Sequence, residues 1–165
     1  MTDILRLFFI IILLTIALTS YFLVLGALFT NRVAKTQRVL TAMPGRSFGV
    51  GLVNFLFFGV IALVLFSLSD KAGSVIKVIL TIPALLITAV LAIMLSFGLV
   101  GIVNLLGERI FPDTSSWKQT VFGSTILSFA CALPFVGWFL LFPYVGFTGI
   151  GAFILGLFQR ETTKP

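Results

Sequence analysis

The sequence predicts an all-α, polytopic membrane protein with a bundle of five transmembrane helices. A bundle of four with a broken or re-entrant helical hairpin at the C-terminal end is the alternative. Charged residues and histidine are absent from four long stretches, residues 7–29, 48–69, 78–107 and 120–158. About 20 apolar residues in a helix span the roughly 30 Å of bilayer hydrocarbon. In addition, 59% of the residues are hydrophobic and the mean hydropathy is +1.22, values that exclude an ordinary soluble domain. The whole chain, residues 1–165, is predicted to form a single transmembrane domain.

The first spanning helix is predicted over residues 4–30, because its apolar stretch is longer than the core of a signal peptide, about 7–15 residues. Residues 31–47 follow and contain no acid. Their apolar residues favour a short helix on the membrane surface, and Pro44-Gly45 is predicted to end it in a turn. Four basic side chains of this segment are expected to contact lipid headgroups or a partner: Arg32, Lys35, Arg38 and Arg46.

The second and third helices are predicted over residues 48–68 and 75–106, with a short polar turn between them. The stretch 120–158 is too long for one crossing, because a straight helix of this length would extend roughly 58 Å. Three residues are predicted to break it: Pro134, Gly137 and Pro143. This gives helices over residues 116–133 and 138–159. A re-entrant pair of half-helices is tolerated where other helices shield the exposed backbone.

Basic residues between the spans predict the orientation. With five crossings, one side holds Arg32, Lys35, Arg38, Arg46, Arg109, Lys118, Arg160 and Lys164, and the other holds Arg6, Lys71 and Lys77. Basic residues accumulate on the cytoplasmic side. The N-terminus is therefore predicted outside and the C-terminus in the cytoplasm, in a bacterial inner membrane.

Small residues recur on three of the predicted helices, and small residues let helix backbones approach closely in lipid. We expect these to mark helix–helix packing: Thr88, Ala92, Ser96, Ser124, Ser128, Ala132, Gly149 and Gly156. A docking face for another protein is the second interpretation of the residues at 88–96 and 124–132, and a groove for lipid or a partner is that of Gly149 and Gly156. The strongest polar residues within the spans are Asn54 and Asn104, which we expect to form an interhelical hydrogen bond. A role in binding a solute is the alternative.

The sequence contains no set of residues that predicts a catalytic or metal-binding site. No ionisable side chain lies deep in a predicted span, where proton relays and ion-coupled carriers place them. There is no histidine, and the one cysteine is Cys131. The protein is therefore predicted not to be an enzyme and to have no cofactor. The net charge of +6 is dispersed at the ends of apolar stretches, which favours membrane lipids over nucleic acid as partner.

Several local patterns occur in the order found in one known group of proteins. A basic stretch leads into Phe48-Gly49-Val50-Gly51-Leu52, then Phe97-Gly98-Leu99-Val100-Gly101, then Leu133-Pro134-Phe135-Val136-Gly137-Trp138, and a Gly-rich helix closes the series. Over residues 20–158 this order resembles the polytopic membrane module of bactofilin-like, polymer-forming cytoskeletal proteins of bacteria. Those fused members carry a β-helix domain, which is not expected in this chain. The resemblance implies a membrane module with an anchoring or scaffolding role.

Three functions follow from these observations. The first is a non-enzymatic membrane protein that anchors, scaffolds or completes a larger membrane assembly, with other membrane subunits or further copies of itself as partners. The second is a small passive pore or a transporter of lipid or hydrophobic solutes, with the broken stretch around residues 134–146 lining the path. The third is a pigment- or quinone-binding accessory subunit, for which the 19 phenylalanines would supply apolar surface.

Overall fold

The computed structural model describes residues 2–71, 73–133 and 135–158, and every side chain within them except those of residues 2–4 and 7. All of its regular structure in this part of the chain is helical. The helices are α1 (Thr2–Leu28), α2 (Thr30–Ala42), α3 (Pro44–Lys71), α4 (Ser74–Ile110), α5 (Ser116–Ala132), the π-helix η1 (Val136–Leu141) and α6 (Phe142–Phe158).

Four helices are long and apolar enough to cross a bilayer, which is compatible with an integral membrane protein. They cover Phe8–Leu28, Pro44–Lys71, Ser74–Ile110 and Val136–Phe158, the last being η1 and α6 together. The predicted fifth span is not among them. Its helix, α5, has 17 residues, about 25 Å, and falls short of the roughly 30 Å of hydrocarbon. The all-α class is confirmed, and the count of five spans is not.

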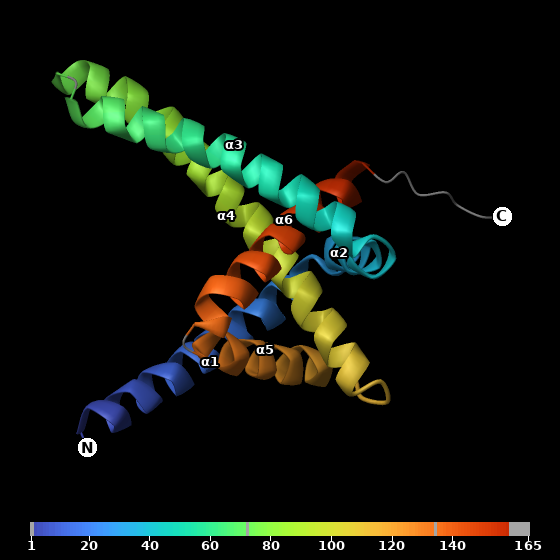
Figure 1. Ribbon diagram of the computed structural model, residues 1–165. Helices are drawn as coiled ribbons and strands as arrows, with labels where there is room; N and C mark the ends of the chain where they lie inside the picture. The colour runs from blue at the N-terminus through green and yellow to red at the C-terminus, as the bar shows by residue number, and fades with distance from the viewer. Residues whose placement is uncertain (1, 72, 134, 159–165) are drawn as a thin grey trace.

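The helices form two arms that diverge from a common crossing region (Figure 1). One arm is the hairpin of α3 and α4, and the other contains α1, α5 and η1. Helix α6 runs through the crossing and packs against α2, α3 and α4. The N-terminal end of α1 and the last turn of α6, drawn in red, lie at opposite ends of the molecule.

The predicted surface helix is α2, and its sequence separates a buried face from a charged one. Val33, Thr36, Val39 and Leu40 are buried and occur at the three- and four-residue spacing of one helix face. The prediction that Pro44-Gly45 forms a turn is wrong, because Pro44 is the first residue of α3. Proline suits that position, where a helix needs no N–H group and the fixed φ is already helical.

Glycine makes the packing at the crossing region possible. A Cβ atom on Gly98 of α4 would lie 2.2 Å from the carbonyl carbon of Gly149 of α6. A Cβ on Gly51 of α3 would lie 1.7 Å from the carbonyl oxygen of Phe147, and one on Gly151 would lie 1.7 Å from that of Ser47. Real Cβ atoms cannot occupy such positions, so α6 contacts both neighbours through its bare backbone.

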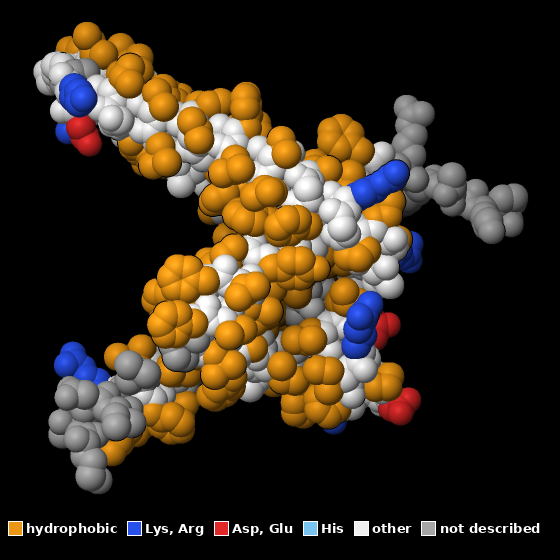
Figure 2. Space-filling view, in the orientation of Figure 1, with side chains coloured by type: hydrophobic (Ala, Val, Ile, Leu, Met, Phe, Trp, Pro, Cys, Tyr) orange, Lys and Arg blue, Asp and Glu red, His pale blue; other side chains and the backbone are white. Residues whose placement is uncertain are grey.

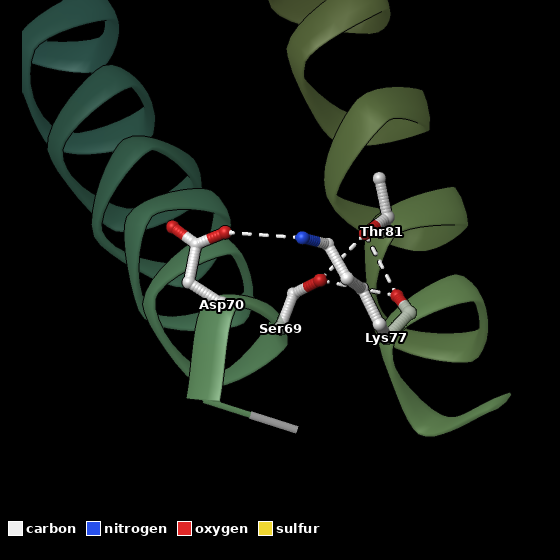
Figure 3. A network of polar contacts seen from close by, with 4 residues as sticks. All are labelled: Ser69, Asp70, Lys77 and Thr81. Carbon is white, nitrogen blue, oxygen red and sulfur yellow. Dashed lines mark hydrogen bonds and ion pairs between the residues drawn. The ribbon is translucent and has the colours of Figure 1, made fainter. Parts of the chain in front are cut away.

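At the tip of the α3–α4 hairpin, a small polar network closes the turn (Figure 3). Ser69 lies 2.6 Å from Thr81, hydroxyl to hydroxyl, and Thr81 lies 2.7 Å from the carbonyl oxygen of Lys77. The Ser69 hydroxyl also lies 3.1 Å from the same Lys77 carbonyl oxygen. Each hydroxyl has one hydrogen, so one of the two donates to the other, which donates to Lys77. The ammonium of Lys77 is 3.8 Å from the carboxylate of Asp70, and both are largely exposed, so this ion pair adds little stability.

Candidate functional site

The charged side chains on the face drawn in Figure 2 gather at opposite ends of the molecule, and apolar side chains cover the arms between them. At the α2 end, Arg32, Arg38 and Arg46 are exposed. Lys35 is half-buried and has an interaction of its own. The four basic residues predicted to contact headgroups or a partner thus lie on α2 and in the first turn of α3. The charge count also used Arg160 and Lys164, which lie outside the described residues.

The small residues predicted to pack helices lie in three different settings. Ser124 is completely buried, and its hydroxyl is 2.7 Å from that of Thr19 in α1. Gly149 contacts α4, as described above, and Gly156 faces α2, where a Cβ atom on it would lie 3.7 Å from the backbone nitrogen of Thr36. Ser96 accepts a hydrogen bond of 2.8 Å from the Tyr21 hydroxyl of α1. These four residues lie at helix contacts.

The other four predicted packing residues border hollows in the apolar surface. Thr88 and Ala92 line one of about 500 Å³ between α3 and α4. Ser128 and Ala132 line a larger groove on the other arm. Small side chains at these positions leave space in the surface of the protein.

The predicted hydrogen bond between Asn54 and Asn104 is wrong. Asn54 donates to the carbonyl of Val50 in its own helix, at 2.9 Å. Asn104 accepts from the hydroxyl of Thr120 in α5, at 2.7 Å. Helix α5 starts close to the end of α4, and its polar residues therefore satisfy Asn104 locally.

The predicted break in the last apolar stretch is present and has an unusual backbone. Helix α5 ends at Ala132, the π-helix η1 begins at Val136, and Phe135 between them has φ 65° and ψ −66°. This conformation costs a non-glycine residue of the order of 1–3 kcal/mol. Pro134 itself lies outside the described residues. Gly137 is required there, because a Cβ would lie 2.5 Å from the carbonyl oxygen of Cys131.

The prediction that Pro143 breaks a helix is wrong, because η1 leads directly into α6 and the chain stays helical through Pro143. Pro143 is the second residue of α6, so it lies in a first turn. Its ring would meet the carbonyl four residues earlier in an α-helix, and it has no N–H to donate. The wider turn of η1 directly before it relieves this conflict, and Phe142 donates to the carbonyl of Gly137 in the i→i+5 pattern of a π-helix.

The groove on the α1 arm has a volume of about 780 Å³. This is within the range of small-molecule sites, roughly 300–1,000 Å³. Its walls come from α1, α5, η1 with the residue before it, the start of α6 and one residue of α4. They are Ile11, Leu14, Thr15, Leu18, Phe22, Leu99, Leu127, Ser128, Cys131, Ala132, Phe135, Trp138, Phe139, Phe142 and Val145.

Polar groups are few in this groove. Thr15 donates its hydroxyl hydrogen to the carbonyl of Ile11, at 2.8 Å. Ser128 makes no hydrogen bond within the described part of the chain, which leaves its hydroxyl open to a ligand. The groove is therefore suited to an apolar ligand that makes at most one polar contact with the groove walls.

Sequence reasoning identified Ser128, Ala132 and Gly137 but assigned them to packing or to a helix break. It missed the groove, because the α1 side of the wall is an ordinary leucine- and isoleucine-rich stripe. The available signal was the combination of Pro143 with the aromatic cluster Phe135, Trp138, Phe139 and Phe142.

No protein family, curated protein or solved structure matches this chain at a significant level. The assignment of function therefore depends on the geometry of the molecule itself.

Proposed function

We propose that this protein is a non-enzymatic subunit that anchors or completes a larger assembly in the membrane. The observation that carries the proposal is the α3–α4 arm, which projects away from the other helices (Figure 1). Its contacts with α6 are at its base, at Gly51, Phe55 and Gly98. Further out, a Cβ added to Gly59 would meet nothing within 4 Å.

The projecting part of this arm has the features of a helix-docking surface. Gly59, Ala62, Thr88 and Ala92 surround the hollow between α3 and α4. Small residues of this kind accept a neighbouring helix at short distance in lipid, where van der Waals packing drives association. The partner proposed is a membrane-spanning helix of another subunit or of a second copy of this chain.

Native mass spectrometry of the protein, extracted gently from its own membrane, tests this role. A defined complex larger than the monomer is expected. Ala92→Trp should fill the hollow and release the partner, whereas Ile93→Trp, at the next position on the same helix, should leave the complex intact. A monomer without associated protein contradicts the proposal.

The groove on the α1 arm favours a second candidate, a carrier or binding protein for lipid or a hydrophobic solute. Its apolar walls and volume are those of a site for such molecules. Flux of a lipid analogue across proteoliposomes separates the two candidates. Transport by the purified monomer supports the second candidate, and an inert monomer that functions only within a complex supports the first.

A further inference from the structure

We infer that the groove between α1, α5 and η1 binds one acyl chain of a phospholipid, whose phosphate lies near Arg6. This site does not depend on the assembly role proposed above. Three observations support the proposal: the position of the groove along the spanning helices, the backbone conformation at its mouth, and the positive charge beyond that mouth.

The position of the groove along the membrane-spanning helices determines whether water or lipid surrounds it. Its α1 wall extends from Ile11 to Phe22, inside the apolar span Phe8–Leu28. Its other wall includes the start of the span Val136–Phe158. A groove at this level faces hydrocarbon instead of water, so lipid chains are the molecules that reach it.

The backbone at the mouth of the groove has an energetically unfavourable conformation. Phe135 has a left-handed φ of 65°, and the π-helix follows directly. Strained residues and π-helices both cluster at functional sites. Here they turn the aromatic rings of Trp138 and Phe139 outward, and the two side chains are 71% and 76% exposed while lining the groove. Tryptophan is typical of the membrane–water interface.

Charge complementarity identifies the polar end of the occupant. Arg6 is exposed and lies five residues before Ile11 on α1, about 7.5 Å further along the axis. The N-terminal end of α1 extends beyond the α5–η1 turn at the same end of the molecule (Figure 1). A chain that enters past Phe135 and reaches Phe22 therefore has its headgroup at the level of Arg6 along the α1 axis, and a guanidinium pairs well with phosphate.

Native mass spectrometry of the delipidated full chain, titrated with dioleoyl phosphatidylglycerol, tests the site. We expect one phospholipid to be retained more strongly than any further ones. Ala132→Phe and Ser128→Phe, which fill the groove from α5, should weaken that first binding about tenfold or more. The matched variant Ala92→Phe, which fills the hollow on the other arm, should leave it unchanged. Equal loss in all three variants, or no preferred first phospholipid, overturns the proposal.

Tryptophan fluorescence provides a readout that needs no substitution in the groove. In a Trp117→Phe background, Trp138 is the single tryptophan. Phospholipid with brominated acyl chains, added to the protein in detergent, should quench it saturably near one equivalent. Quenching that rises linearly with lipid, as for a ring facing bulk lipid, overturns the proposal.

The placement of the phosphate has its own pair of variants. Arg6→Gln should weaken binding of dioleoyl phosphatidylglycerol severalfold. Lys71→Gln removes a cation from the same end of the molecule but on the other arm, and should have no effect. Equal effects of the two variants overturn the placement beside Arg6, and retention of decylubiquinone in preference to phospholipid overturns the assignment of the ligand.

Discussion

Gly98 and Gly149 show how single residues decide packing in this molecule. In Gly98→Ala, the new methyl group would lie 2.2 Å from the backbone of α6, and a backbone cannot move aside as a flexible side chain can. We expect the free energy of unfolding to fall by about 1–3 kcal/mol, the usual cost of overpacking. Unfolding of the purified protein by SDS titration in mixed micelles measures this change.

Gly59→Ala is the matched control for that substitution. Its Cβ meets nothing within 4 Å, and alanine is favoured over glycine in a helix by roughly 0.5–1 kcal/mol. The control should therefore be neutral or stabilising. Equal destabilisation by the two variants would mean that Gly98 matters for its flexibility and not for the close approach of α4 and α6.

Replacement of Phe135 by glycine is expected to make the folded protein more stable. Relief of a left-handed φ gains of the order of 1–3 kcal/mol, and the flexibility of glycine in the unfolded chain costs about 0.5–1 kcal/mol. Phe135 is 78% exposed, so few contacts are lost. Phe135→Gly should raise the free energy of unfolding by about 1 kcal/mol, whereas Phe139→Gly, within η1, should lower it. A loss of stability in Phe135→Gly contradicts the strain argument.

Among the elements, the long helices could be predicted from the sequence and their exact starts could not. Long stretches without charged residues indicate the positions of α1, α3 and α4, because charged side chains are excluded from hydrocarbon. The same criterion placed the start of α3 near Phe48, one turn after its actual start at Pro44. Polar and basic residues in a first turn lie outside the hydrocarbon, so the hydropathy pattern does not report them.

Helix α2 leads to a prediction about anionic lipid. Its buried residues fix it against α4 and α6, so Arg32 and Arg38 remain exposed on its other side. Each cation near an anionic membrane surface contributes about 1 kcal/mol. Replacing both with glutamine should reduce the excess of phosphatidylglycerol over phosphatidylcholine that copurifies from mixed vesicles.

The control for this experiment keeps the charge and changes the same helix. Asn31→Ala and Thr41→Ala remove exposed polar groups from α2 and should leave the lipid ratio unchanged. Raised salt should diminish the difference between the two double variants, since exposed charges are screened. A lipid ratio that is the same in both would show that α2 does not attract anionic lipid.

For the whole molecule, the class of fold was predictable and the arrangement of the helices was not. Lipid tails are as apolar as leucine, so burial of apolar area does not select which helix faces meet. Asn54 illustrates this limit, because its pairing depended on knowing which helices are neighbours. The groove illustrates it too, since Ser128 and Ala132 had the spacing of packing residues but line a cavity.

The divergence of the two arms predicts that stability is concentrated at their crossing. Ile150 of α6 is 1% exposed in that region, whereas Ile79 of α4 is 63% exposed on the projecting arm. Ile150→Ala should cost about 2–5 kcal/mol of unfolding free energy, as for other large-to-small core substitutions. Ile79→Ala should cost little, because its side chain contacts lipid or detergent in the folded protein. Both variants remove the same atoms, so SDS unfolding compares their positions alone. Similar losses in the two would mean that the α3–α4 arm is covered in solution, as a second copy of the chain docked on that arm would produce.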